Sequence, residues 1–148
     1  MDVDQDETMR TPGHYFSRIT RGLTRIGDVR LRSLGFATAQ LPVLSVLKDG
    51  ARMSQGELAR LIRVEQPTMA QLLARMERDG LVRREPDPSD RRSSLVSLTE
   101  KALAKLPAGR EVLIQGNRDA TRGLSADEVE TLIGLLRRVL ENVEAMDA

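Results

Sequence analysis

Four side chains in one segment have the types and the spacing that a single kind of chemistry requires. They recur at positions i, i+3, i+7 and i+10, namely Thr68, Gln71, Arg75 and Arg78. On an α-helix this spacing places all four on one face. Glutamine can bond the N6 and N7 atoms of adenine as a pair, arginine can clamp a guanine edge or a phosphate, and threonine can contact a phosphate or a base. These residues form a candidate DNA-reading face, and the alternative is an ordinary solvated helix face.

A second charged group lies in residues 86–93, a stretch rich in turn-forming residues. Arg91 and Arg92 follow Asp90 there. Two arginines at the tip of a loop do not contribute to packing of the core. An arginine that enters a narrow minor groove meets concentrated negative potential. We assign Arg91 to a DNA contact and Asp90 to bracing of the loop through an ion pair with Arg92. Arg92 suits either task, the DNA contact or the bracing. The alternative is a surface turn with an exposed ion pair worth under about 1 kcal/mol.

The elements that must position these residues follow from apolar periodicity and capping signals. Apolar residues at helical spacing predict six helices, over about 13–33, 38–48, 54–62, 66–79, 99–122 and 126–146. Strands are predicted at 81–85 and 94–98, on either side of the 86–93 loop. Ser54 with Glu57, and Ser125 with Glu128, form capping boxes that start the third and the last helix. Gly35 is a candidate to end the first helix.

The third and fourth helices are short, are joined by a tight turn and are followed by the hairpin. On the fourth helix the apolar stripe lies opposite the DNA-reading face and consists of Met69, Leu72, Leu73 and Met76. The third helix is expected to bury Leu58, Leu61 and Ile62. This order of elements defines a winged helix-turn-helix, a mainly α fold with a small β-hairpin wing. We add Ser54 and Gln66, at the starts of the two helices, to the candidate DNA contacts.

The two terminal helices carry apolar stripes that a small core would not fully cover. The last helix is expected to bury Val129, Leu132, Leu136, Val139 and Val143. Surplus apolar faces at both ends of the chain argue for a homodimer. We therefore expect one domain over 12–148, in which 12–36 and 100–148 form the dimerisation helices and 38–99 the winged lobe. The acidic residues 1–11 that precede it are expected to be disordered.

Composition excludes several classes of function. The 148 residues contain no cysteine and one histidine, which rules out disulfides, thiolate metal sites and multi-histidine metal sites. We expect no cofactor and no enzyme activity, because no nucleophile–base pair can be proposed. No apolar run of about eighteen residues and no secretion signal is present, so we expect a cytoplasmic, nucleoid-associated protein with no membrane contact.

The net charge of +1 hides an uneven distribution along the chain. Residues 10–32 hold six arginines against one acid, and residues 52–92 hold nine arginines against seven acids. Residues 126–148 hold six acids against two arginines. A basic face set apart from an acidic end suits a polyanionic partner, and solvated helix faces are the alternative.

Five runs of sequence carry a resemblance to a known family: Ser54-Gln55-Gly56-Glu57-Leu58-Ala59, Glu65-Gln66-Pro67-Thr68-Met69, Leu81-Val82-Arg83-Arg84, Asp90-Arg91-Arg92-Ser93 and Val96-Ser97-Leu98-Thr99. They resemble the MarR family of bacterial transcription regulators, and most closely its SlyA branch. The resemblance covers about residues 14–146 and is densest over 54–99. The Asp-x-Arg hairpin followed by Val-x-Leu-Thr is its most specific part.

The resemblance implies a homodimer whose first, fifth and sixth helices interlock and whose winged lobes bind a pseudo-palindromic operator in double-stranded DNA. It implies that the protein is a repressor, or a repressor and anti-silencer. Pro67, Thr68, Gln71 and Arg75 would face the major groove, and Arg91 would enter the minor groove. SlyA-like members often carry arginine in place of Gln71, and glutamine favours adenine where arginine favours guanine.

The resemblance also implies a small effector. Many members lose DNA affinity when a small anionic phenolic compound binds between the dimer helices and the winged lobe. Residues of the first helix could supply a carboxylate clamp and a ring contact for such an aromatic carboxylate or phenol: His14, Tyr15, Arg18 and Arg21. Alternatively these arginines are solvated or contact phosphate. For the whole protein, the competing reading is a winged-helix module that binds protein or RNA without a specific operator.

Overall fold

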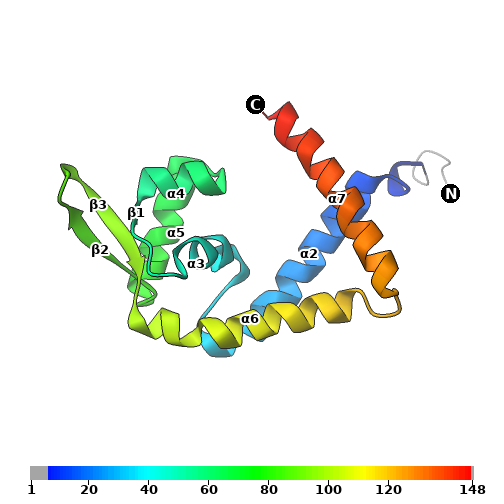
Figure 1. Cartoon of the computed structure of the whole chain (residues 1–148), viewed down its shortest axis with the longest axis horizontal. Helices are drawn as coiled ribbons and strands as arrows, with labels where there is room; N and C mark the ends of the chain where they lie inside the picture. The colour runs from blue at the N-terminus through cyan, green and yellow to red at the C-terminus, as the bar shows by residue number, and fades with distance from the viewer. Residues whose placement is uncertain (1–6, 148) are drawn as a thin grey trace. The chain divides into compact units, whose positions relative to one another are not determined.

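The computed structural model describes residues 7–147, which are mainly helical with one small antiparallel sheet (Figure 1). The helices are α2 (Pro12–Leu31), α3 (Leu41–Leu47), α4 (Gln55–Ile62), α5 (Gln66–Arg78), α6 (Glu100–Ala120) and α7 (Ala126–Met146), with 3-10 turns η1 (Arg32–Leu34) and η2 (Thr38–Gln40). The strands are β1 (Met53–Ser54), β2 (Val82–Asp87) and β3 (Asp90–Leu98). This composition confirms the predicted fold class. The chain forms two compact units that divide between Leu113 and Ile114.

The first helix begins where local sequence allows its unpaired amides to be satisfied. The Thr11 side chain accepts a hydrogen bond from the His14 amide at 3.3 Å, and Pro12 fills the first helical position. Part of the expected disorder over 1–11 falls on residues 1–6, which lie outside the described residues. Residues 7–9 form a helical turn, so regular structure begins before the boundary that we expected.

The core of the first unit lies between α3, α4, α5, α6 and the sheet. Its fully buried side chains include Leu47, Leu58, Leu73 and Val96. The prediction that α4 buries Leu61 is wrong, because this side chain is 58% exposed. The buried residues of this short helix are Leu58 and Ala59, so Ala59 faces the core where we expected Leu61 to do so.

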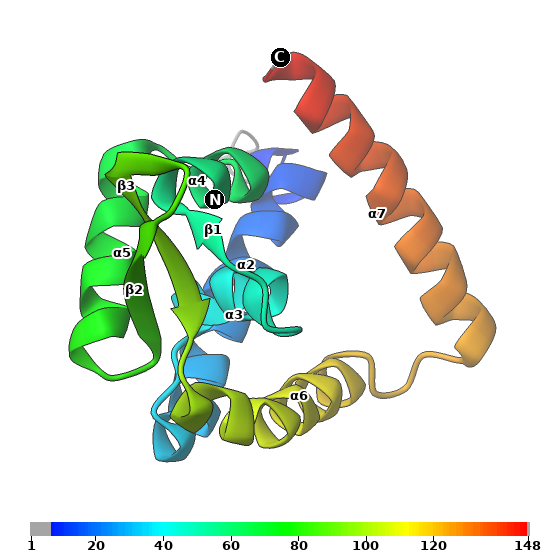
Figure 2. The ribbon, with the colours of Figure 1, turned by 60° about the vertical axis from the view of Figure 1, so that its left-hand side comes forward.

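The hairpin is longer and its turn is tighter than the sequence suggested. The sheet has the order β1-β3-β2, with Val82 opposite Leu98 and Met53 opposite Val96. Only Pro88 and Ser89 separate the two long strands, so the expected loop over 86–93 is wrong, as is the early end of the first strand at residue 85. The two-residue strand β1 was not predicted at all. Figure 2 shows the hairpin running beside α5, which contacts β2.

The last helix matches its predicted bounds but not its predicted burial. In α7 the Ser125–Glu128 capping box is complete, with both reciprocal hydrogen bonds present at 2.9 and 3.1 Å. Within one chain, however, no residue of α7 is buried, so the expectation that it covers five apolar side chains is wrong for the single chain.

A close approach joins α2 to the start of the winged lobe. A Cβ atom on Gly27 would lie 2.6 Å from Cγ2 of Thr38, so only glycine fits there without displacement. At the next residue, Oδ1 of Asp28 accepts hydrogen bonds from the backbone amide and the hydroxyl of Thr38, each at 2.8 Å. On the other side of the lobe, buried Phe36 packs over Gly109 of α6. These contacts tie α2 and α6 to the lobe within the first unit.

The Asp28 contact predicts a specific pH dependence of stability. The amide and hydroxyl bonds from Thr38, with a smaller contribution from Arg32, hold the pKa of Asp28 below its usual 3.8. A carboxyl group with a lowered folded-state pKa stabilises the fold above its unfolded pKa and loses that contribution as the pH falls through the folded value. We expect Asp28→Asn to lower the thermal midpoint at pH 7, and the difference from wild type to narrow as the pH falls below 3.8.

Thermal unfolding of both proteins at pH 7 and at pH 3 measures this difference. Asp49→Asn is the matched control because Asp49 lies in an exposed turn. An Asp28→Asn deficit of the same size at both pH values would contradict the assignment of the stabilisation to the ionised carboxylate.

Candidate nucleic-acid interface

The two faces of α5 divide as its sequence predicted. Met69, Leu73 and Met76 are completely buried. Thr68, Gln71, Arg75 and Arg78 are all exposed on the opposite side. Among residues 7–147, Thr68, Gln71 and Arg75 have no side-chain hydrogen bond or ion pair, so these groups are available to a ligand. The prediction of a polar face is therefore confirmed, while its role in reading DNA stays a prediction.

The ends of α5 are fixed by local geometry. Pro67 occupies its first turn, and the helix ends where Gly80 adopts a left-handed backbone with φ 75°. The amide of Leu81 then bonds the carbonyl of Met76 at 2.8 Å, which closes the helix and turns the chain into β2. The tight turn between α4 and α5 depends on Arg63, which takes a left-handed φ of 63°. The candidate DNA-reading face thus lies on a helix whose start and end are both constrained.

Three of the predicted contact residues already have partners within the protein. The Ser54 hydroxyl accepts the Glu57 amide at 3.2 Å and so caps α4, although no return bond from the Glu57 side chain is present in the described part of the chain. Nε of Arg78 lies 3.3 Å from Oδ1 of Asp79. Nε2 of Gln55 donates to Oε1 of Gln66 at 3.3 Å, a contact between the first residues of α4 and α5.

The turn of the wing is held by two aspartates. Oδ1 of Asp87 accepts the amide and the hydroxyl of Ser89 at 2.9 and 2.7 Å, and these bonds hold the pKa of Asp87 below its usual range. Asp90 does brace the turn, but through the backbone amide of Arg92 at 3.0 Å. The predicted ion pair between these two side chains is absent from the residues that the structure describes. Bonding to the backbone leaves both Arg91 and Arg92 exposed at the start of β3.

Ion pairs that the sequence did not reveal attach the hairpin to its surroundings. Nε of Arg84 on β2 lies 3.0 Å from Oε2 of Glu77 on α5. Glu85 pairs with Arg52 at 3.0 Å and with Arg83 at 3.5 Å. Such exposed pairs contribute up to about 1 kcal/mol each, and of these three only Arg84–Glu77 joins the wing to α5. Arg83 and Glu85 are two residues apart on β2, which is the spacing of one strand face. The other two pairs join separate segments, so only the folded chain brings their members together.

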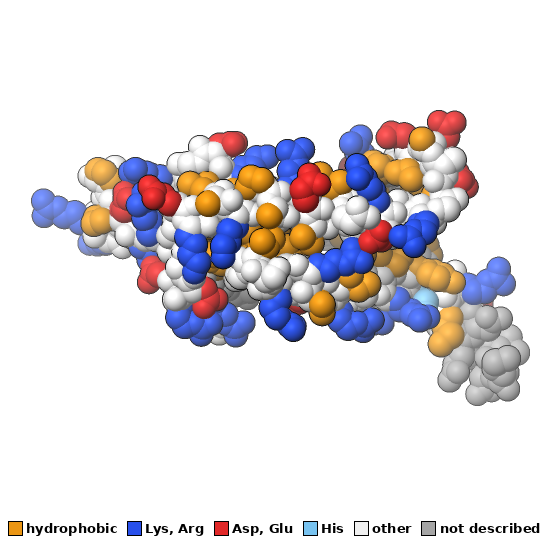
Figure 3. Space-filling model, turned by 90° about the horizontal axis from the view of Figure 1, so that it is seen from below, with side chains coloured by type: hydrophobic (Ala, Val, Ile, Leu, Met, Phe, Trp, Pro, Cys, Tyr) orange, Lys and Arg blue, Asp and Glu red, His pale blue; other side chains and the backbone are white. Residues whose placement is uncertain are grey.

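The base of the wing is joined to α5 and α6 by one threonine. The Thr99 hydroxyl donates to the Gly80 carbonyl at 2.6 Å and accepts the amide of Ala102 at 3.2 Å. Nζ of Lys101 donates to the Asp79 carbonyl at 3.0 Å. The end of α5, the end of the hairpin and the start of α6 therefore meet at one hydrogen-bonded junction. Figure 3 shows basic side chains, with acidic ones beside them, at the end of the molecule that the wing forms.

Of the four residues proposed for an effector, one lines the groove that the structure shows along α2. His14 and Tyr15 on α2 make an edge-to-face ring contact with centroids 5.5 Å apart, and Tyr15 is exposed. Arg18 is exposed, and Nη1 of Arg21 donates to the Ser17 hydroxyl at 2.6 Å. An open groove of about 480 Å³ follows α2 farther along, and of the four residues only Arg21 lines it.

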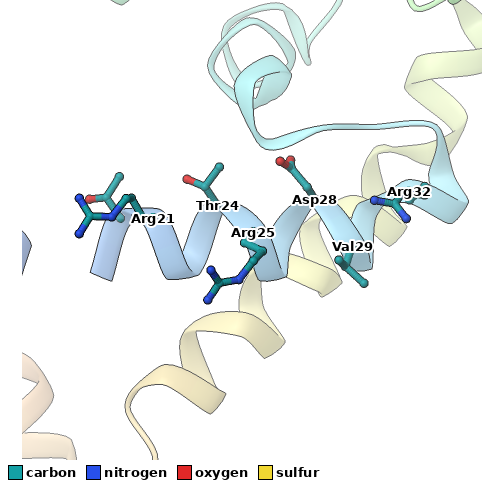
Figure 4. Close-up of a pocket in the computed structure, with 7 residues that line it drawn as sticks. Arg21, Thr24, Arg25, Asp28, Val29 and Arg32 are labelled. Atoms are coloured by element: carbon teal, nitrogen blue, oxygen red, sulfur yellow. The ribbon is translucent and has the colours of Figure 1, made fainter. Parts of the chain in front are cut away.

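The groove is shallow and basic. Figure 4 shows that its lining residues project from α2 in several directions, with Arg25 and Asp28 on different sides of the helix. The complete lining is Thr20, Arg21, Thr24, Arg25, Asp28, Val29 and Arg32. Among residues 7–147, no three His, Asp or Glu side chains are grouped so that they could hold a metal ion. In the same residues, no helix has the length and the apolar character needed to cross a membrane.

Two short helices with a tight turn, an exposed polar face on the second and a braced hairpin define a winged helix-turn-helix protein. A family model described as MarR family matches residues 34–93. A mutant MarR from E. coli is 30% identical, with a TM-score of 0.72, over 88% of this chain and 96% of that one. The chain belongs to the MarR family of winged-helix, DNA-binding transcriptional regulators.

Two further solved structures extend the similarity. The same E. coli mutant in complex with operator DNA is 28% identical, with a TM-score of 0.81, over 95% of this chain and 99% of that one. The transcriptional regulator SlyA is 27% identical, with a TM-score of 0.78, over 87% of this chain and 91% of that one. Both matches cover far more of the chain than residues 34–93.

Proposed function

We propose that this chain acts as a homodimer that binds a pseudo-palindromic operator and represses transcription, as a repressor or a repressor and anti-silencer, in the cytoplasm at the nucleoid. The observation that carries the proposal is the exposed face of α5, opposite a buried stripe. Within the described part of the chain, the side chains of Thr68, Gln71 and Arg75 on this face have no partner. The similarity to a chain solved with operator DNA supports this proposal.

The residues of the interface take different tasks in this proposal. Pro67 and Thr68 in the first turn of α5 approach the DNA backbone, where the helix N-terminus favours phosphate. Gln71 bonds adenine, and Arg75 clamps guanine or a phosphate. Arg78, which is paired with Asp79, is suited to a phosphate contact at the edge of the site, as is the start of α4 at Ser54.

Arg91 and Arg92 reach the minor groove from the wing. Both are exposed, and the Asp90 bond to the Arg92 amide fixes the backbone between them without neutralising either guanidinium through an ion pair. A narrow groove attracts such a cation through its concentrated negative potential. The helix and the wing together would then contact two grooves from one lobe.

The terminal helices supply the dimer contact. On α2 the exposed apolar residues include Ile19, Leu23 and Ile26, and on α7 they include Leu136 and Leu140. Exposed apolar faces on two long helices are typical of surfaces that another chain covers. A dimer would present two α5 helices, which bind half-sites about 34 Å apart, or one helical turn.

A small aromatic carboxylate or phenol is the proposed effector, with α2 supplying the cations. Arg21 and Arg25 line the groove, and Arg18, His14 and Tyr15 lie along the same helix toward its start. An arginine can hold a carboxylate by two parallel hydrogen bonds, and a ring such as Tyr15 can pack on the aromatic part. Binding at this position would act on the dimer helices and through them on the spacing of the two lobes.

A binding titration tests the function. The duplexes are DNA from upstream of the protein's own gene and a scrambled duplex, at two salt concentrations, with and without salicylate. Selective binding that weakens with salt and with salicylate supports the whole proposal. Selective binding that is unchanged by salicylate contradicts only the proposed effector and leaves the proposed operator binding in place. Weak, equal binding to both duplexes favours the module that binds protein or RNA without an operator.

We expect Arg91→Ala to weaken binding to every duplex. The plot of log affinity against log salt should become flatter by about one unit, because one cation–phosphate contact is lost. Titrations at four salt concentrations measure the slope. Arg110→Ala, an exposed arginine of α6, is the control and should keep the wild-type slope. An Arg91→Ala slope equal to that of wild type would place this side chain away from the DNA.

A further inference from the structure

The first residues of α4 and α5 are both glutamines, and their side chains touch. Nε2 of Gln55 donates to Oε1 of Gln66 at 3.3 Å, across the turn that contains Arg63. Gln55 is half-buried and Gln66 is exposed. The exposed amide of Gln66 is therefore held by the side chain of Gln55, which is itself less free to move because it is half-buried. The DNA-contact residues identified from the sequence include Gln66 but not Gln55.

Gly56 also contributes to the position of the Gln66 side-chain amide. A Cβ atom added to Gly56 would lie 3.1 Å from Nε2 of Gln66, which is closer than ordinary van der Waals contact. The absence of a side chain at Gly56 thus leaves the space that the Gln66 amide group occupies. Gln55 holds the amide oxygen while Gly56 gives room to the amide nitrogen, so both ends of the Gln66 amide have a defined position.

The held amide keeps the groups that adenine requires. Oε1 of Gln66 has two lone pairs, of which the Gln55 bond uses one, and Nε2 keeps its two N–H groups. Adenine offers an N6 donor and an N7 acceptor side by side in the major groove, which match one oxygen and one N–H of an amide. Guanine offers two acceptors there, so the amide oxygen would face a second oxygen.

We propose that Gln55 is a positioning residue which, with Gly56, orients Gln66 to read an adenine in the major groove. This inference rests on the proposed function and adds a specificity determinant to it. A glutamine already held in its binding geometry loses less rotamer freedom when it binds than a free one. Gln66 can therefore discriminate at full strength only while Gln55 and Gly56 are in place.

The test compares the preferred sites of variants by selection from a pool of randomised duplexes. Besides the adenine assigned to Gln71, wild type should show a second position in each half-site where adenine is preferred by about 5- to 150-fold, the range for one bidentate contact. Gln66→Ala should remove that preference. Gln55→Ala should reduce it several-fold, while affinity for non-specific DNA stays as in wild type. Gln115→Ala, a glutamine bonded to Asp119 on α6, is the control.

Two measurements separate positioning from loss of folding and from phosphate contact. Gly56→Ala should also relax the preference, although alanine favours the helix and the thermal midpoint should not fall. Replacing the selected adenine with 7-deazaadenine removes N7, so wild type should lose affinity. That loss should vanish in Gln66→Ala and shrink in Gln55→Ala.

The outcomes distinguish this inference from the function on which it rests. If wild type selects no sequence, the proposed function fails and the inference fails with it. If wild type selects an operator and Gln55→Ala keeps the full adenine preference, only the positioning role is overturned. A uniform loss of affinity for all duplexes in Gln55→Ala, with the preference intact, also overturns it and makes Gln55 a phosphate contact.

Discussion

Replacing Leu73 with alanine lowers the free energy of unfolding by about 2–5 kcal/mol, the range for deletion of a fully buried leucine side chain. Leu73 lies in the middle of α5 and has no exposed surface. Its removal loses the transfer free energy of the deleted carbons and leaves a cavity that a helix fixed at both ends cannot readily collapse. Urea unfolding at one fixed protein concentration measures the change, because the proposed dimerisation would make stability depend on concentration.

Leu61→Ala on the neighbouring helix is the matched control. The same atoms are deleted, but Leu61 is 58% exposed, so we expect a loss well below that of Leu73→Ala. The folded fraction of Leu73→Ala should still select the wild-type DNA sequence, since the reading face of α5 is untouched. Equal losses for the two leucines would mean that α5 does not pack as described.

Replacing Leu136 and Leu140 together with glutamate should convert the proposed dimer to a monomer. The two side chains lie one turn apart on α7 and are 42% and 55% exposed in the single chain. The substitution therefore lowers the folding stability of the isolated chain only slightly. In an apolar dimer contact it buries two unpaired carboxylates, at a cost on the order of several kcal/mol. Light scattering should give the mass of one chain, and affinity for a two-half-site operator should fall by about 10²–10⁴-fold.

Arg138→Glu is the control for charge. It changes the net charge by the same two units as the double variant, and it lies two residues from each leucine, on another side of the helix. We expect it to remain a dimer with wild-type helix content. If the double variant also remains a dimer, α7 is not the contact surface, and the homodimer proposed above must use another face.

Local sequence was sufficient for the helices and for the polar face of α5. The bounds of α7 follow from the Ser125–Glu128 capping box and a regular apolar period, both of which act within a few residues. The same period separates buried Leu73 from exposed Gln71. Since a winged helix-turn-helix is an order of such elements, the fold class and the exposed polar face of α5 could be predicted without a structure.

Tertiary structure decided everything that depends on which segments meet. The hairpin turn shrinks to two residues because Asp87 bonds Ser89 and Asp90 bonds the Arg92 backbone, which no spacing rule distinguishes from a longer loop. Strand β1 is two residues long, too short for a period, and exists only because β3 lies beside it.

The same reason applies to the contacts of the candidate site. Arg84 meets Glu77 and Gln55 meets Gln66 through the packing of separate elements, at sequence separations without periodic meaning. The sequence by itself determined which residues share the exposed polar face of α5, because faces are a local property of a helix. Only the tertiary structure determined which neighbours hold those residues in place, because that depends on contacts between elements and not on spacing within one.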